Sequence, residues 1–170
     1  MTKAKTRTAT WRDHVLDEGL LAGDRWVTVA REHIRETLQA LQGEGYRGYG
    51  FITCVDHLAT PDRPAPAERF EMVYQLRRLD TYEEIRVRVF VPESDATVPS
   101  VHDIFRPANW DERETWDLFG IRFEGHPDLT RILMPDDWAG HPLRRDYPVG
   151  GEPVDFSAEH ETWQTAPEEA

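Results

Sequence analysis

Cysteine and long apolar runs are scarce in this sequence. Cys54 is the single cysteine in 170 residues, which excludes an internal disulfide and any zinc or iron–sulfur site that needs several cysteines of this chain. No stretch approaches the roughly 20 apolar residues of a membrane-crossing helix. The start, MTKAKTRTAT, lacks the apolar core of a signal peptide. We therefore expect a soluble, intracellular chain with room for one domain, with or without an appended arm.

Positive charge is scarce as well. The formal net charge is −12, which argues against a nucleic-acid partner because neutralising phosphates requires surplus Lys and Arg. Lysine occurs only at Lys3 and Lys5, so nearly all of the 20 basic residues are arginines. Genomic base composition explains this bias. Pairing with acidic partners at an interface explains it too, because the planar guanidinium suits partly buried ion pairs.

Apolar periodicity predicts a strand and a helix near the start of the chain. Residues 25–30 have the composition of a strand. After them, Ile34, Leu38 and Leu41 recur at helical spacing and are followed by two glycines. These features predict a helix over residues 31–42 with one apolar stripe.

Three further strands are predicted downstream. Residues 48–58 are rich in aromatic and β-branched types. In residues 70–77 and 85–91 apolar and polar side chains alternate, which predicts an antiparallel hairpin with one face on the core and one wetter face. The order of elements predicts an α+β fold: an open, mainly antiparallel sheet of about four strands covered by helices, with an irregular extended C-terminal arm.

The residue pattern of the sequence changes after residue 99. Asn109 and Glu112 match the capping-box pattern, and Gly120 stands where a left-handed helix cap is wanted, so we expect a short helix over residues 109–119. Residues 121–147 combine many turn-forming residues with a high apolar and aromatic content. This combination is unusual for a solvated loop and indicates irregular chain that rests on another surface.

These patterns divide the chain into four parts. Residues 1–10 form a flexible tail, because they are polar and lack periodicity. Residues 11–106 form the α+β domain, and residues 107–148 form a docking segment. Residues 149–170 form an acidic, extended tail, because they hold too few large apolar groups for a core of their own.

A cluster of charged residues marks the predicted helix. Arg113 and Asp117 are neighbours one turn apart, and Glu114 shares a flank with Asp117. Together with Glu112, these carboxylates could serve acid–base catalysis, but such runs are more often a charged helix face. Because aromatic residues indicate that the helix is largely covered, we expect its acids to pair with arginines of this chain or of another.

Histidines suggest a second kind of site. His126 and His141 each lie in a Gly-His-Pro triplet, with several acids nearby: Asp128, Asp136, Asp137 and Asp146. A metal site is one interpretation. The spacing of ligands on a helix or hairpin is absent, however, and an imidazole in such a turn more often binds a backbone carbonyl. Cys54 lies in the middle of a predicted strand, where we expect a buried and inert thiol.

The run Arg144-Arg145-Asp146-Tyr147-Pro148 is the last motif. Adjacent arginines beside an acid could bind an anion or dock onto an acidic neighbouring protein. The chain has no GxGxxG, no GxxxxGK[ST] and no recognisable pair of nucleophile and base. The motifs therefore favour docking over catalysis.

Residues 99–148 resemble a specific family. The motifs ERE with Asp117 and FG, then GHP with DL, RIL, Trp138, GHPL and RRDYP occur in this order and without gaps. Together they are similar to the signature region of the 30-kDa subunit of respiratory complex I (NADH:quinone oxidoreductase). Thr130 departs from the pattern, because the family usually has a second basic residue before Arg131.

The resemblance implies a structural role without chemistry. Members of this family sit in the peripheral arm of complex I, at the cytoplasmic face of the cell membrane. It implies that this chain has no catalytic residues and holds no metal, while FMN, iron–sulfur clusters and quinone are bound by partner subunits. The expected partners are other peripheral-arm subunits, above all the one that forms the quinone site. We expect the following residues at subunit interfaces: Glu112, Arg113, Glu114, Asp117, His126, Arg131, Trp138, His141, Arg144, Arg145, Asp146 and Tyr147.

Two alternatives remain open at this point. The first is the homologous subunit of a membrane-bound hydrogenase or of another donor:quinone oxidoreductase, which shares the docking segment. The second is a free-standing metal-dependent hydrolase that uses His126, His141 and the nearby acids. Co-purified subunits would separate the first alternative from a complex I subunit, and metal analysis would separate the second.

Overall fold

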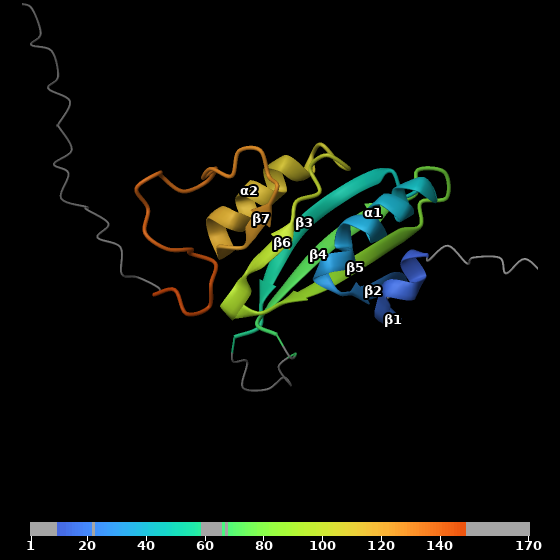
Figure 1. Cartoon of the computed structure of the whole chain (residues 1–170), viewed down its shortest axis with the longest axis horizontal. Helices are drawn as coiled ribbons and strands as arrows, with labels where there is room; N and C mark the ends of the chain where they lie inside the picture. The colour runs from blue at the N-terminus through green and yellow to red at the C-terminus, as the bar shows by residue number, and fades with distance from the viewer. Residues whose placement is uncertain (1–9, 22, 59–65, 67, 149–170) are drawn as a thin grey trace, which may run out of the picture.

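The computed structural model describes residues 10–21, 23–58, 66 and 68–148 (Figure 1). Apart from Thr10, the tails expected at residues 1–10 and 149–170 lie outside the described residues. Residues 59–65 and 67, in a proline-rich stretch of the sequence, lie outside them as well.

Five strands of the described chain form one sheet, in the order β1-β2-β5-β4-β3. Their bounds are β1 Val15–Leu21, β2 Asp24–Val29, β3 Gly48–Asp56, β4 Phe70–Arg77 and β5 Glu84–Val91. Within this sheet only the β2–β5 pair is parallel. The expected α+β class with an open, mainly antiparallel sheet is therefore confirmed. The sheet has one strand more than expected, because β1 pairs along the outer edge of β2.

The β4–β5 hairpin has the register that its alternation predicts. Met72 lies opposite Val89, and Tyr74 lies opposite Val87, and all four side chains are buried in the core. The opposite face of β4 was expected to be solvent-accessible, but it is more buried than expected, because Gln75 on that face is also buried. The hairpin therefore supplies the central layer of the core.

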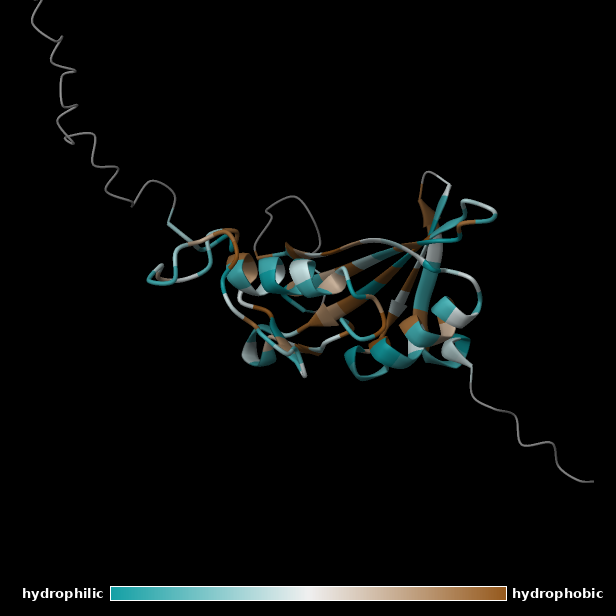
Figure 2. Cartoon of the chain, turned by 90° about the horizontal axis from the view of Figure 1, so that it is seen from above, coloured by the Kyte–Doolittle hydropathy of each residue, from teal (hydrophilic) through white to brown (hydrophobic). Residues whose placement is uncertain are grey.

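A helix covers the apolar face of the sheet. The 3-10 helix η1, Trp11–His14, precedes β1, and the expected helix over 31–42 begins as the 3-10 turn η2, Arg31–His33, before it continues as α1, Ile34–Gly43. Figure 1 shows α1 in front of the sheet, running roughly along the strands, and Figure 2 shows the hydrophobic residues gathered chiefly on the strands. The apolar stripe predicted for α1 is confirmed, since its buried positions include Ile34, Leu38 and Leu41.

A second helix lies against the β3 edge of the sheet. Helix α2, Ala108–Phe119, contacts β3, and the carboxylate of Asp111 accepts hydrogen bonds from the Tyr49 hydroxyl at 2.5 Å and from the Ile52 amide at 2.8 Å. These bonds occupy an amide that an edge strand would otherwise present to other chains. Gly120 ends α2 in the left-handed region, with φ 75°, as its position predicts.

The fold continues through residue 106, the expected end of the α+β domain. After the 3-10 turn η3, Glu93–Asp95, strand β6, Thr97–Pro99, pairs in parallel with β7, Arg122–Glu124. Helix α2 lies between these two strands in the sequence. The irregular C-terminal arm therefore begins only after β7, and we use this name for residues 125–148.

The capping box expected at the start of α2 is wrong. The helix begins at Ala108 with Pro107 at the N-cap position and without a side-chain cap. Glu112 does not reach back to Asn109. Its carboxylate instead accepts hydrogen bonds from the Ser100 hydroxyl at 2.5 Å and from the Val101 amide at 2.7 Å. The acid thus satisfies polar groups of a neighbouring segment rather than of its own helix.

Candidate docking surface

Glu112 is a fully buried acid that joins α2 to the chain before it. Its two oxygens hold Ser100 and Val101, and the Nε2 atom of His126 lies 3.9 Å away. Burial raises the pKa of Glu112 to about 7, although the hydrogen bonds from Ser100 and Val101 oppose this shift. Burial lowers the pKa of His126. Both shifts favour the neutral forms, and neither side chain is exposed to act as a charged pair at the surface.

Asp117 is the second buried acid of α2 and organises the start of the C-terminal arm. Its Oδ2 atom accepts hydrogen bonds from the amides of Ile132, Leu133 and Met134 at 3.0, 2.8 and 2.9 Å. Its Oδ1 atom pairs with Arg131 at 2.5 Å. Burial opposes ionisation, but these donors outweigh it and lower the pKa of Asp117 to about 2. The expectation that an acid of this helix pairs with an arginine is confirmed for Asp117.

Two arginines hold the backbone of the arm. Arg131 donates to the carbonyl oxygens of Trp138 at 2.7 Å and Gly140 at 3.2 Å, in addition to its pair with Asp117. Arg113 does not turn to Asp117, one helical turn away. It donates to the carbonyl oxygens of Thr130 at 3.1 Å and Arg131 at 2.9 Å. Such contacts replace the regular hydrogen bonds that the arm lacks.

The two Gly-His-Pro histidines bind backbone carbonyls, as expected for such turns. A ring nitrogen of His126 lies 3.3 Å from the carbonyl oxygen of Asn109, and one of His141 lies 2.9 Å from that of Asp117. Asn109 and Asp117 lie near opposite ends of α2. The structure therefore does not bring the two histidines together, and the metal-dependent hydrolase loses the site on which it depended.

The end of the arm is fastened to α2 and to the sheet. Arg144 donates from Nε to the Phe119 carbonyl oxygen at 2.5 Å, and its guanidinium lies over the ring of Phe70. Arg144 therefore has partners inside this chain, although we expected it at an interface. The side chain of Tyr147 donates to the Ala139 carbonyl oxygen at 3.3 Å.

An ion-pair cluster that the sequence did not reveal lies beside this end of the arm. Arg69, almost fully buried, pairs with Asp56 at 2.8 Å, with Asp146 at 2.7 Å and with Glu93 at 2.5 Å. Asp56 also accepts a hydrogen bond from the Arg145 amide at 2.9 Å. Burial opposes ionisation of Asp56, but its hydrogen bonds, that of Arg69 first, lower its pKa to about 2. The sequence feature that could have indicated this cluster is Asp56, which stands at the end of an apolar strand. A buried acid in such a place requires a partner.

The expected interface residues thus fall into two groups. The charged side chains of Glu112, Asp117 and Arg131 are buried or nearly buried and bind within the chain. The side chains of Glu114 and Arg145 belong to exposed residues, and Trp138 is half-buried. The first group shapes the arm, and only exposed side chains can contact another protein directly.

Large apolar side chains are exposed on α2 and on the arm. Trp110 is 58% exposed, Leu133 is 60% exposed and Leu143 is 52% exposed. The backbone of each leucine is held, because the Leu133 amide donates to Asp117 and the Leu143 amide donates to the Leu118 carbonyl oxygen. Exposed apolar groups on a fixed backbone are typical of protein interaction sites. Among the described helices, none is long and apolar enough to cross a membrane.

Comparison with known proteins places this architecture in a family. Residues 27–153 match the model of the family described as the respiratory-chain NADH dehydrogenase, 30 Kd subunit. The chain is 46% identical over 145 residues to NADH-quinone oxidoreductase subunit 5 of Thermus thermophilus, covering 82% of this chain and 68% of that protein. It is 40% identical over 134 residues to an NADH-quinone oxidoreductase subunit of Acidothermus cellulolyticus, covering 79% of this chain and 69% of that protein.

Solved structures share the fold. A trypsin-resistant fragment of Nqo5 aligns with a TM-score of 0.59 at 41% identity, covering 63% of this chain and 83% of the fragment. A chain of the membrane-bound sulfane sulfur reductase, an archaeal respiratory membrane complex, aligns with a TM-score of 0.66 at 25% identity, covering 78% of this chain and 76% of that one. With the family model matching most of its length, this chain belongs to the family of the 30-kDa subunit of respiratory-chain NADH dehydrogenase.

Proposed function

We propose that this chain is a non-catalytic structural subunit in the peripheral arm of a proton-translocating NADH:quinone oxidoreductase. The observation that carries the proposal is the family match over residues 27–153, which includes the C-terminal arm up to its last described residue. Its relatives are named as subunits of NADH-quinone oxidoreductase. In this role the chain supports electron transfer from NADH through iron–sulfur clusters to quinone without reacting itself.

The state of the acids in α2 supports a role without catalysis. Glu112 and Asp117 are the motif carboxylates best placed for acid–base chemistry, yet both are fully buried and bound by donors of this chain. A general acid or base must reach the proton that it transfers. In this proposal FMN, the clusters and quinone are all held by partner subunits.

The C-terminal arm supports a role in docking. Arg131 and Arg144 turn inward and bind backbone carbonyls, while Leu133 and Leu143 are exposed. An irregular segment with this division of side chains presents a preformed surface, which lowers the entropy cost of association. We assign the arm to other peripheral-arm subunits, above all the one that forms the quinone site, at the cytoplasmic face of the membrane.

A second candidate has weaker support. The likeness to a chain of the archaeal sulfane sulfur reductase complex indicates that this fold also serves respiratory complexes with another electron donor or acceptor. The corresponding function is the homologous subunit of a membrane-bound hydrogenase or of another donor:quinone oxidoreductase. The relatives of higher identity favour the NADH-linked complex.

Affinity purification tests the proposal. The tagged full chain is isolated from native membranes in mild detergent, and its partners are identified by mass spectrometry. We expect flavin- and cluster-binding subunits together with NADH:quinone activity, and no flavin or cluster absorption from the chain alone. Co-purification with subunits that hold a nickel site would instead support the second candidate. A chain recovered without any respiratory subunit would contradict both.

A further inference from the structure

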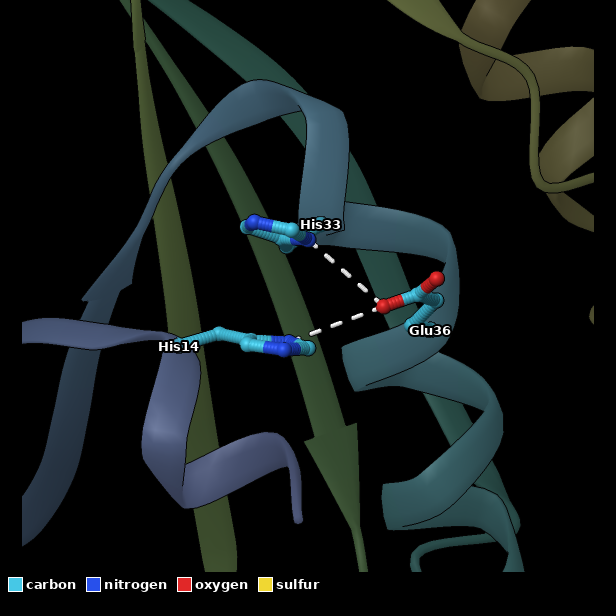
Figure 3. Close-up of side chains that lie close together, drawn as sticks. All are labelled: His14, His33 and Glu36. Carbon is cyan, nitrogen blue, oxygen red and sulfur yellow. Dashed lines mark ion pairs between the residues drawn. The ribbon is translucent and has the colours of Figure 1, made fainter. Parts of the chain in front are cut away.

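Three potential metal ligands meet at the base of the β1–β2 hairpin. His14 ends η1, His33 ends η2 and Glu36 lies in the first turn of α1. Figure 3 shows both imidazoles directed at the same carboxylate oxygen. The Nδ1 atom of His14 lies 3.7 Å from Oε2 of Glu36, and the Nδ1 atom of His33 lies 3.5 Å from it. Among the described residues, this is the group of His, Cys, Asp and Glu that could hold a metal ion.

The spacing of these atoms suits a tetrahedral ion. Zinc lies about 2.0–2.2 Å from nitrogen and oxygen ligands, so two ligands on a tetrahedron are roughly 3.3–3.5 Å apart. The two separations from Glu36 are at this value or slightly above it, and all three ligand atoms lie within 4.8 Å of one another. Binding would require the two imidazoles to turn out of their stacked arrangement, because the lone pair of each nitrogen lies in the plane of its ring. Two imidazoles with one carboxylate suit zinc and its first-row neighbours, whereas calcium and magnesium prefer oxygen ligands.

A second observation points to a ligand. The Nδ1 atom of His14 is buried and has no hydrogen-bond partner, although buried polar atoms in proteins are normally satisfied. The two imidazole rings are stacked, with centroids 4.0 Å apart and planes 19° apart. A metal ion would satisfy the Nδ1 atom of His14.

We propose that His14, His33 and Glu36 bind one divalent transition-metal ion of the zinc type. His14 immediately precedes β1, and His33 follows β2 by one short turn, so the ion closes the base of the hairpin. Through Glu36 it also ties the hairpin to α1. Glu36 is largely exposed, so water can reach the ion and occupy its fourth coordination position. The role is structural, and it replaces the sequence-based expectation that this chain holds no metal.

Titration of the untagged, chelator-treated full chain tests the site. Zinc chloride is titrated calorimetrically, and cobalt(II) is titrated while the ligand-field absorption of a tetrahedral ion is followed. We expect one equivalent of either ion to bind and to raise the melting temperature, because a ligand that binds only the folded state stabilises it. Magnesium and calcium should do neither. Binding should weaken as the pH falls, because protons compete for the imidazole nitrogens.

Matched variants locate the binding. Glu36→Gln and His33→Gln should each weaken zinc binding at least about tenfold, since even changes to outer-shell groups cost 10–100-fold in metal affinity. Glu32→Gln, a change of a neighbouring exposed acid, should leave it unaltered. Circular dichroism confirms that each variant is folded. Failure of the native chain to bind one equivalent, or equal binding by all three variants, would overturn the proposal. Neither outcome affects the docking role, which rests on other residues.

Discussion

Two acids of one helix, both without solvent exposure, ionise in opposite ways. Burial alone raises the pKa of each, because it disfavours the charged form. Asp117 receives three backbone amides and the guanidinium of Arg131, which outweigh burial. Glu112 receives only a hydroxyl and one amide. The number and charge of the donors therefore decide that Asp117 is ionised and that Glu112 titrates near neutrality.

Glu112 should make the stability of the protein depend on pH. Its pKa of about 7 in the folded state exceeds the ordinary glutamate value of 4.5, so the folded state binds the proton more tightly than the unfolded state does. The stabilisation is complete below pH 4.5 and is lost as the pH rises through 7. The shift corresponds to about 3 kcal/mol. In Glu112→Gln, the loss of unfolding free energy between about pH 5 and pH 8 should shrink by this amount.

The glutamine can keep both hydrogen bonds, because its oxygen accepts from Val101 and its amide donates to Ser100. Urea unfolding at several pH values measures the effect. Glu114→Gln on the exposed side of α2 is the matched control and should retain the pH dependence of the native chain. An unchanged slope in Glu112→Gln would mean that Glu112 is ionised throughout this range.

Asp117→Asn should destabilise the protein at neutral pH. The asparagine side chain has only one oxygen that can accept hydrogen bonds, and it leaves the nearly buried Arg131 without its counter-charge. Removing one partner of a buried ion pair costs roughly 3–5 kcal/mol. We expect this loss in the unfolding free energy, together with faster hydrogen exchange at the amides of residues 132–134. The exposed Asp137→Asn should show neither effect, and similar exchange in both variants would contradict the assigned role.

At the scale of elements, the C-terminal arm differs from the rest of the fold in how its backbone is satisfied. Helices and strands satisfy their amides and carbonyls by repeating patterns. The arm has isolated backbone hydrogen bonds and relies on side chains for others: Asp117 binds its amides, and Arg113, Arg131 and Arg144 bind carbonyls of the arm or of α2. Such segments depend on single residues, because one side chain can hold several backbone groups. The close fit of the arm against the end of α2 follows from this.

Gly120→Ala should disrupt that fit. Gly120 has a positive φ, and a β carbon there would lie 2.6 Å from the His141 ring and 2.7 Å from the Arg144 guanidinium. Gly125 also has a positive φ, but nothing lies within 4 Å of a β carbon at that position. The left-handed conformation alone costs an alanine roughly 1–2 kcal/mol.

We therefore expect Gly125→Ala to lose about 1–2 kcal/mol of unfolding free energy and Gly120→Ala to lose distinctly more. Only Gly120→Ala should also speed hydrogen exchange in residues 138–147. Denaturant unfolding and exchange mass spectrometry measure the two effects. Equal losses in both variants would show that the arm does not press against this end of the helix.

Periodicity predicted the strands β4 and β5 and the helix α1 to within a few residues, because burial imposes a period of two or of 3.6. Helix α2 also lies close to its expected bounds, but it was predicted from residues at its ends, of which Gly120 is confirmed and the capping box is wrong. The strand β1 was not predicted. It lies at the edge of the sheet and its residues are mostly exposed, so no alternation marks it. The strands β6 and β7 have three residues each, too few for any period.

The site could be predicted only where its contacts are local. Gly120 follows from the end of its helix, and the Asp128 amide donates to His126 within the turn of its triplet. The two histidines bind carbonyls as expected, but these carbonyls belong to Asn109 and Asp117 in α2, 17 and 24 residues away. The pair of Arg69 with Asp146 joins residues 77 positions apart. Such a contact depends on how the whole chain folds, and nothing in the spacing of the two residues indicates it.

For the molecule as a whole, the arginines are used chiefly inside the chain. Ion pairs join Arg12 to Glu44, Arg35 to Asp103 and Arg131 to Asp117, and Arg69 binds three acids. The structure therefore accounts for much of the arginine without any partner. The formal charge of −12 remains as an excess of acid. Electrostatic complementarity then favours partners that present basic residues, and association that is faster at low salt.

Apolar contact should supply the affinity that charge does not. Leu133 and Leu143 are exposed in the arm, and Leu79 is 62% exposed in the turn between β4 and β5. Replacing an exposed leucine removes little from the stability of the isolated chain. The two leucines are already about half covered in the isolated chain. If partners cover the arm, Leu133→Ser with Leu143→Ser therefore loses roughly 2–3 kcal/mol of association free energy.

We expect this double variant to melt normally when isolated and to be recovered poorly with the membrane complex. Leu79→Ser, a change of the same kind outside the arm, should be recovered as well as the native chain. Melting curves and quantitative mass spectrometry of the purified complex measure the two properties. Because Asp117 and Arg131 fix the backbone beside Leu133, a failure of incorporation with normal melting would assign docking to the arm. Normal incorporation of the double variant would move the docking surface elsewhere on the chain.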